Sequence, residues 1–81
     1  MKYYYTYILR SIKDGYLYTG WTDNLKTRID RHNKGLVKAT RTRRPLVLVY
    51  YEACLNKSKA IVREKQLKTG FGRAYLKRRI I

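Results

Sequence analysis

The chain has 81 residues, enough for one small domain, so we expect a single domain over residues 1–81. It carries 20 Lys and Arg against 5 Asp and Glu, and a net charge of +15 attracts polyanions, nucleic acid first and acidic protein or membrane surfaces second. One cysteine and one histidine exclude an intrachain disulfide and a Cys/His zinc site, and no apolar run could span a bilayer, so we expect a cytoplasmic protein, with nucleoid association left open.

The first quarter of the chain predicts a β-hairpin. Residues 3–10 and 16–21 are rich in tyrosine and branched side chains, which favour strands, and Asp14-Gly15 between them is a turn signal. A two-residue turn there would leave Tyr7 and Tyr18 on one face but roughly 13 Å apart. A longer loop, from about residue 11 to residue 15, would place the two tyrosines opposite each other, and the sequence leaves both registers open.

A helix is expected after the hairpin, with Thr22-Asp23 as its N-cap and Gly35 as its C-terminal stop. Residues at i, i+3, i+4 and i+7 share one stripe of a helix. Here that stripe contains Leu25, Arg28, Ile29 and His32. Arg28 and His32 are one turn apart, so their side chains can converge on a common point.

The second half predicts one more strand and two helices. Residues 38–44 read as a basic, irregular loop, and residues 46–53 as a third strand whose two faces are both apolar, which indicates cover on both sides. A helix is expected from residue 57 or 58 to about Gly70. The glycines of residues 70–72 then predict a break, followed by a short last helix over residues 73–80.

Three side chains have the chemistry that a phosphodiester nuclease needs. Arg28 can hold a phosphate oxygen, His32 can take or relay a proton, and Glu64 can hold Mg²⁺. Each has a plainer interpretation: Arg28 as an anchor without catalysis, His32 as a residue near the negative end of a helix, Glu64 as an ion-pair partner. However, Glu64 shares a stripe with apolar residues in a strongly basic chain, which favours a site role.

These residues, taken in order, resemble the motifs of the GIY-YIG nuclease family. The matching stretches are Tyr5-Thr6-Tyr7, which keeps only the final tyrosine, Tyr18-Thr19-Gly20, which keeps the first and last residues, then Arg28, His32 and Glu64. Residues 42–45 and 68–73 look like the short stand-alone bacterial members related to the nuclease module of the excision-repair incision subunit. Gly20, read as a strand-ending glycine, also lets a backbone or phosphate come close.

The resemblance implies an α+β fold, a small three-stranded antiparallel sheet flanked by about three helices. It implies that Tyr7 is the general base, assisted by His32, and that Tyr18 and Arg28 orient the scissile phosphate. Glu64 would hold one Mg²⁺ or Mn²⁺ ion. The polar residue, often Asn, that many members use beyond this glutamate has no match here.

We therefore expect a metal-dependent endonuclease that hydrolyses phosphodiester bonds in DNA, in repair or in the processing of structured DNA, with RNA left open. The cations expected to contact nucleic acid are Lys38, Arg41, Arg43, Arg44 and Arg73. The alternative is a non-catalytic nucleic-acid-binding module of the same fold, which would not need Glu64. Docking on acidic proteins or membranes ranks last, because it leaves the Tyr, Arg, His and Glu set unexplained. A separate specificity protein and the oligomeric state stay open.

Overall fold

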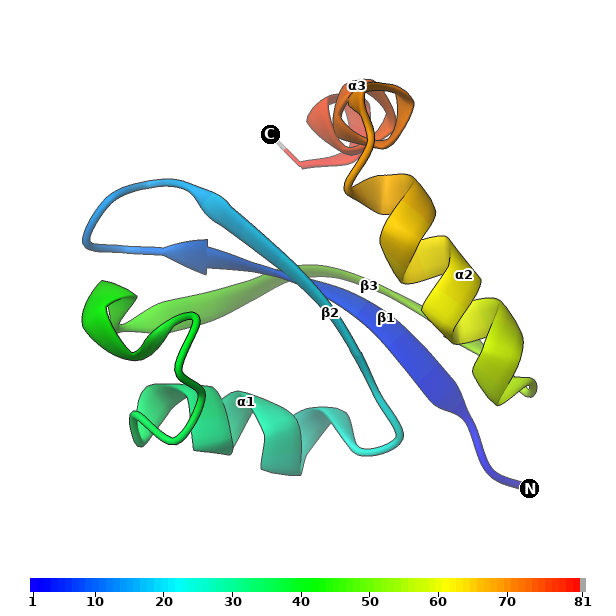
Figure 1. Ribbon diagram of the computed structural model, residues 1–81, viewed down its shortest axis with the longest axis horizontal. Helices are drawn as coiled ribbons and strands as arrows, with labels where there is room; N and C mark the ends of the chain where they lie inside the picture. The colour runs from blue at the N-terminus through cyan, green and yellow to red at the C-terminus, as the bar shows by residue number, and fades with distance from the viewer. Residues whose placement is uncertain (81) are drawn as a thin grey trace.

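A computed structural model describes residues 1–80 of the protein. The elements along the chain are β1 (Tyr4–Ser11), β2 (Leu17–Thr22), α1 (Leu25–Asn33), a 3₁₀ turn (Arg41–Arg43), β3 (Leu46–Cys54), α2 (Lys57–Leu67) and α3 (Gly70–Arg79). The strands form one antiparallel sheet in the order β2-β1-β3, with α1 on one face and α2 and α3 on the other (Figure 1). This is the α+β fold that the sequence predicts. None of these helices is long and apolar enough to cross a membrane.

The strand covered on both faces is β1, at the centre of the sheet. Tyr7, Ile8 and Leu9 have no exposed surface; Tyr7 and Leu9 pack toward α1, and Ile8 packs against α2 and α3. The prediction of full cover for the third strand is wrong, because Val47 and Tyr51 of β3 are 46% and 52% exposed. The helix α2 packs mainly over β1 and β2, and β3 lies at one edge of the sheet, which leaves it partly in solvent.

The loop of the β1–β2 hairpin is longer than the two-residue turn, but it does not place Tyr7 and Tyr18 directly opposite each other, as the longer alternative predicted. Arg10 pairs with Leu17, the backbone N–H of Ser11 donates to the carbonyl of Tyr16 at 3.0 Å, and residues 12–15 form the loop. Tyr18 therefore stands opposite Leu9, one diagonal step from Tyr7 on the same face. The two tyrosine ring centroids are 6.5 Å apart, so the register itself brings these side chains together.

The N-cap of α1 lies one residue beyond the predicted pair Thr22-Asp23. Asn24 is its N-cap, and its side-chain oxygen accepts from the Thr27 backbone N–H at 3.1 Å. The Thr22 hydroxyl instead accepts from the Asn24 N–H, which holds the turn between β2 and the helix. At the other end Gly35 has φ +78°, which confirms its role as the stop, because this left-handed conformation favours glycine.

The helix α3 begins at Gly70, so the predicted break at residues 70–72 is its first turn. Thr69 caps it, because its hydroxyl accepts from the Gly72 backbone N–H at 3.2 Å. Gly72 is buried, and a Cβ there would run into the backbone of Gln66 and Leu67 at the end of α2. The two helices therefore meet at a close backbone contact, which sets the direction in which α3 leaves.

A cluster of polar and aromatic side chains from β3, α2 and α3 holds α3 in place. Arg63 donates to both carboxylate oxygens of Glu52 at 2.9 Å, and the Tyr50 hydroxyl donates to the same carboxylate at 2.6 Å. The ring of Tyr75 lies 4.8 Å from the Arg63 guanidinium carbon and 4.3 Å from that of Arg79. These contacts hold the helix that carries Arg73.

Candidate active site

The Tyr7 side chain lies across the backbone of β2 at Gly20. The two residues are cross-strand partners, and a Cβ on Gly20 would lie only 2.5 Å from the Tyr7 hydroxyl oxygen. The close approach predicted for Gly20 is real, but the group that approaches is the Tyr7 ring, and β2 continues past Gly20 to Thr22. Glycine at this position thus places the Tyr7 hydroxyl over the edge strand of the sheet.

Four side chains form one hydrogen-bonded row beneath the sheet. The Arg28 Nε–H donates to the Tyr7 hydroxyl oxygen at 3.3 Å, that oxygen lies 2.8 Å from His32 Nε2, and His32 Nδ1 lies 2.7 Å from the Thr40 hydroxyl oxygen. Arginine can only donate, so the Tyr7 proton is satisfied by donation to Nε2. His32 then carries its own proton on Nδ1 and donates it to Thr40.

Burial sets the protonation of this row. It lowers the pKa of His32 to about 4, and the nearby charge of Arg28 adds to the effect. Burial also raises the pKa of Tyr7, with smaller contributions from Tyr18 and Glu64, although the hydrogen bond and charge of Arg28 oppose the rise. At neutral pH the row therefore holds a protonated tyrosine that donates to the unprotonated nitrogen of a neutral imidazole.

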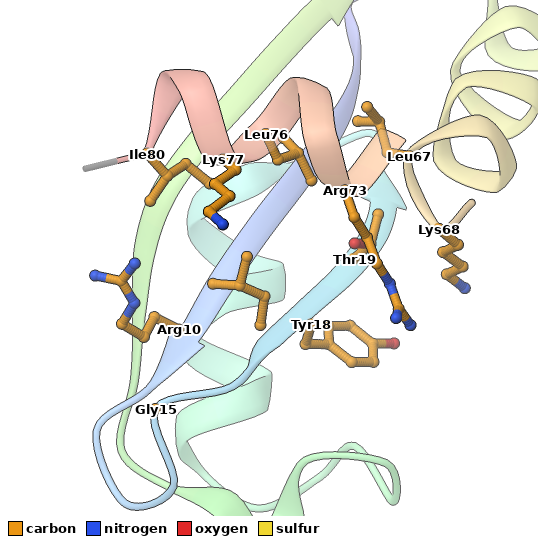
Figure 2. A pocket seen from close by; sticks show the side chains of 11 residues that line it. Arg10, Gly15, Tyr18, Thr19, Leu67, Lys68, Arg73, Leu76, Lys77 and Ile80 are labelled. Atoms are coloured by element: carbon orange, nitrogen blue, oxygen red, sulfur yellow. The ribbon is translucent and has the colours of Figure 1, made fainter. Parts of the chain in front are cut away.

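Tyr18 joins the same cluster from β2. Its ring centroid is 5.1 Å from that of His32, and the ring itself is partly exposed. The hydrogen bond with Tyr7 raises the pKa of Arg28, and Tyr18 contributes to the same rise, so both hydroxyls lie near the guanidinium. Tyr18 also lines a groove whose opposite wall is α3 (Figure 2).

Glu64 approaches from the other side of the sheet, on α2. Its carboxylate pairs with Lys68 at 3.3 Å, and the Glu64 side chain is 16% exposed whereas that of Lys68 is 53% exposed. No hydrogen bond joins Glu64 to the row of four side chains, yet its charge is near enough to raise the pKa of Tyr7. The structure thus gathers Tyr7, Tyr18, Arg28 and His32 in direct contact and places Glu64 in their electrostatic neighbourhood.

Glu64 is the carboxylate of this region that could hold a metal ion. Residues 1–80 contain no group of three or more His, Cys, Asp and Glu side chains that could hold an ion. A single carboxylate still fits Mg²⁺ or Mn²⁺, because Mg²⁺ is commonly held by one or two carboxylates and completed by water and substrate phosphate oxygens. The partner of Glu64 is a mostly exposed lysine on a flexible stem, which can swing away when an ion binds.

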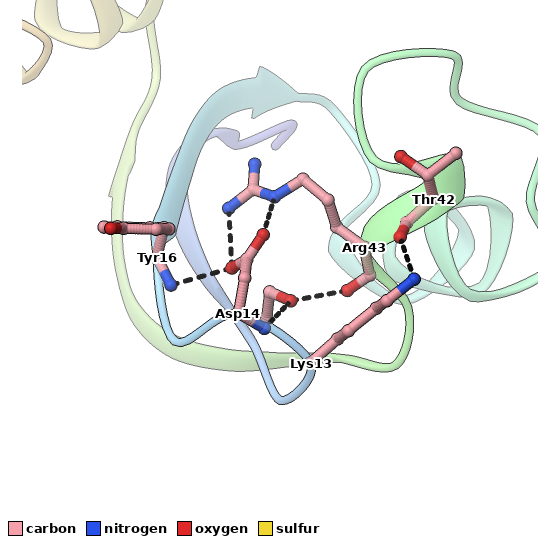
Figure 3. A network of polar contacts seen from close by, with 6 residues as sticks. Lys13, Asp14, Tyr16, Thr42 and Arg43 are labelled. Carbon is pink, nitrogen blue, oxygen red and sulfur yellow. Dashed lines mark hydrogen bonds and ion pairs between the residues drawn. The ribbon is translucent and has the colours of Figure 1, made fainter.

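The predicted nucleic-acid contacts divide into two places. Arg43 is held in the loop by Asp14, at 2.8 Å, and its carbonyl accepts from the Ser11 hydroxyl at 2.6 Å (Figure 3). The Arg43 hydrogen bond lowers the pKa of Asp14. Arg44 donates to the Arg41 carbonyl, and Lys38 and Arg41 are exposed. Arg73 lies elsewhere, on α3 across from Tyr18.

The residue that sequence reasoning missed is Thr40. It has no exposed surface, and its backbone N–H donates to the Val37 carbonyl at 3.1 Å. Figure 3 shows the neighbouring ties: Lys13 donates to the Thr42 carbonyl, and Arg43 binds Asp14 of the hairpin loop. The basic loop is thus anchored to the hairpin, and this anchoring keeps Thr40 against His32. No pattern in the sequence marks Thr40, because only the fold returns the loop to the helix.

Comparison with known proteins identifies the family of the chain. The model of the GIY-YIG catalytic domain matches residues 3–78. The chain therefore belongs to the GIY-YIG family of nuclease domains, among its UPF0213 proteins. A UPF0213 protein of Staphylococcus haemolyticus is 50% identical over 70 residues, covering 85% of this chain and 84% of that one. A UPF0213 protein of Clostridium perfringens is 52% identical over 65 residues, covering 79% of this chain and 69% of that one.

A solved structure supports the same placement. The solution NMR structure of a UPF0213 protein from Bacillus halodurans matches with a TM-score of 0.55 and 36% sequence identity. The match covers 91% of this chain and 81% of that one. The family and the fold that the sequence motifs indicate are thereby confirmed.

Proposed function

We propose that the protein is a divalent-metal-dependent endonuclease that hydrolyses phosphodiester bonds in DNA. The observation that carries the proposal is the row from Arg28 through Tyr7 and His32 to Thr40, which joins a cation, a phenol and a neutral imidazole in contact. Membership of a nuclease family and a net charge of +15 support the same conclusion. Repair or processing of structured DNA in the cytoplasm is the setting we propose.

Tyr7 is the proposed general base. A free tyrosine titrates near pH 10, and burial makes the Tyr7 phenol harder to ionise, so it cannot work as a stored phenolate. Instead the Tyr7 oxygen accepts a proton from the attacking water while its own proton passes to His32 Nε2, 2.8 Å away. His32 is neutral at neutral pH and can receive that proton. The other proton of the protonated His32 stays on Nδ1, where it is donated to the Thr40 hydroxyl oxygen.

Arg28 has two duties in this scheme. In the resting protein it donates to the hydroxyl of the fully buried Tyr7 through the longest bond of the row. Since Tyr7 has no exposed surface, water must displace a neighbouring group to reach its oxygen, and we assign that movement to Arg28. A scissile phosphate beside Tyr18 would draw Arg28 toward itself, because a charged guanidinium binds phosphate oxygens more strongly than a neutral phenol. Substrate binding would thus uncover the base and stabilise the developing charge together.

Glu64 is the proposed protein ligand of one Mg²⁺ or Mn²⁺ ion. When bound, the ion would supply charge neutralisation at the phosphate that the protein side chains alone lack. Glu64 lies on α2, on the other face of the sheet from the cluster of Tyr7 with α1, so its carboxylate and the Tyr7 phenol would approach the phosphate from different sides.

The test is cleavage of supercoiled, linear and branched DNA in Mg²⁺, in Mn²⁺ and with EDTA. We expect metal-dependent nicking that is lost in Glu64→Gln and kept in Asp30→Asn. Asp30 is an exposed carboxylate on α1, so its substitution removes the same charge away from the site. Equal cleavage by Glu64→Gln would remove the metal role. Failure of the wild-type protein to cut any substrate, together with tight binding that metal does not affect, would favour the non-catalytic binding module.

A further inference from the structure

A groove of about 500 Å³ opens beside the candidate active site, between the β1–β2 hairpin and α3. Figure 2 shows Arg73 and Lys77 on the α3 wall and Arg10 and Tyr18 on the hairpin wall. It is formed by elements distant in the sequence, so no motif predicts it. Its position follows from the close contact of α2 and α3 at Gly72.

The charged side chains that line the groove are all positive. Its wall contains four cations, Arg10, Lys68, Arg73 and Lys77, and none of the Asp and Glu side chains. Within residues 1–80 the only one of the four with an acidic partner is Lys68, which binds Glu64. Four cations within one small groove repel each other, and an anionic ligand removes that cost. The charge selects a ligand with more than one phosphate.

The floor of the groove is apolar. Leu67 and Leu76 belong to the core, while Leu17 of β2 is 39% exposed and packs in neither buried cluster. A free phosphate or the outside of a duplex offers no apolar surface that could pack on this floor. An unpaired nucleotide can bind both surfaces, because its phosphate can contact the cations and the face of its base or sugar can pack on the leucines.

The groove is joined to the active site at two points. Tyr18 lines the groove and also contacts the His32 ring, with centroids 5.1 Å apart. Lys68 lines the groove and also pairs with Glu64 at 3.3 Å. A strand whose phosphate lay between Tyr18 and Glu64 would therefore continue directly into the groove.

We infer that this groove binds an unpaired stretch of the DNA strand that is cut, immediately beside the scissile phosphate. The inference rests on the proposed nuclease function and narrows it. The preferred substrate has a single-stranded segment next to the cleavage point, and an intact duplex is a poor substrate. Recognition comes from backbone phosphates and base faces, so the groove carries little sequence preference.

The charge is tested by binding in EDTA, where no cutting occurs. The probe is a fluorescent single-stranded DNA oligonucleotide, and its anisotropy is measured over a salt series. Each phosphate contact contributes about 0.7 to the slope of log affinity against log salt for single strands. We expect Arg73→Ala with Lys77→Ala to lower the slope by about 1.4. Arg78→Ala, an exposed cation of the same helix outside the groove, should lower it by less than half as much. Equal slopes for the double variant and wild type would overturn the inference.

The floor is tested by Leu17→Thr, which keeps a residue suited to a strand and removes the apolar surface. We expect several-fold weaker binding of the single strand and unchanged binding of a duplex of the same length. Leu36→Thr is the control, because Leu36 is 59% exposed and lies outside the groove. An equal loss with duplex and single strand would contradict an unpaired ligand, and a single-stranded RNA arm shows whether the sugar matters.

These measurements separate the two proposals. If the wild-type protein cuts DNA but neither groove variant changes binding, the nuclease stands and the groove inference fails. If both groove variants weaken binding of single strands and the protein cuts nothing, the groove binds nucleic acid and the nuclease proposal fails. If the nuclease cuts intact duplex as fast as duplex with an unpaired segment, the substrate preference is wrong.

Discussion

The Tyr7 ring fills the space that a side chain on Gly20 would occupy on the neighbouring strand. A Cβ at Gly20 would lie 2.5 Å from the Tyr7 hydroxyl oxygen and 2.6 Å from the ring carbon that bears it. The same hydroxyl is held by His32 and Arg28, so it cannot move aside without loss of both bonds. Two residues of two separate motifs thus specify one position for the Tyr7 hydroxyl oxygen, the group that we propose as the general base.

The substitution Gly20→Ala should therefore damage both stability and activity. Displacing a fully buried ring costs about 1–3 kcal/mol, and the loss of the Tyr7–His32 bond should abolish cleavage. The free energy of unfolding in urea and the nicking rate measure the two effects. Gly70→Ala is the control, because a Cβ at Gly70 would have no heavy atom within 4 Å. A folded, fully active Gly20→Ala protein would refute the placement of Tyr7.

Thr40 is expected to act by positioning His32. Thr40→Val keeps the shape but removes the oxygen at 2.7 Å from His32 Nδ1, leaving a buried polar group unpaired at a cost of about 1–3 kcal/mol. The cleavage rate should fall, and Thr40→Ser should restore it. A merely structural role predicts a stability loss alone, so the ¹⁵N shifts of the His32 ring are the added measurement; they should show the Nδ1-protonated form lost in Thr40→Val. Thr42→Val, an exposed neighbour, is the control.

The stability of the protein should fall as pH drops from about 6.5 to about 4. The pKa of His32 is lowered to about 4 in the folded state, against an ordinary 6.5, so within this window only the unfolded chain binds the proton. The contribution of His32 is fully present above the window, and the loss of this contribution across the window is about 3 kcal/mol. Urea unfolding at a series of pH values measures this.

The same claim has a direct spectroscopic form. The ring-proton shifts of His32, the single histidine, should not change between about pH 7 and about pH 5. His32→Gln should unfold with little pH dependence across that window. A titration midpoint near the ordinary value of 6.5 would show that His32 is accessible and charged, and the proton relay to it would then need a different acceptor.

The periodic parts of the fold were predictable from sequence. The stripe of α1 placed Arg28 and His32 one turn apart, and the structure shows both reaching Tyr7. Periodicity is a local property, so helices and strands follow from it. The order of strands does not, and the apolar run of β3 indicated cover on both faces although β1 is the strand that is covered on both. The burial of a strand depends on which elements pack against it, and the sequence of the strand does not specify them.

Non-local contacts account for the other differences. The hairpin loop length was open because Asp14-Gly15 suits both a tight and a longer turn. The bond of the Ser11 hydroxyl to the Arg43 carbonyl involves a residue far along the chain, and it ties the longer loop in place. Thr40 could not be predicted either, because its contact with His32 forms only when the loop folds back onto α1. The start of α3 was missed because the Thr69 cap and the buried Gly72 outweigh the usual cost of glycine in a helix.

The cleavage rate of Tyr7→Phe tests the central claim most directly. The substrate is DNA with an unpaired segment in Mg²⁺, and the control is Tyr5→Phe, which removes a hydroxyl from the same strand without a hydrogen bond to the row. Loss of a general base typically costs 10²–10⁴-fold, so we predict a fall of about 100-fold or more for Tyr7→Phe and a near wild-type rate for Tyr5→Phe. A folded Tyr7→Phe protein that cuts as fast as wild type would contradict the account.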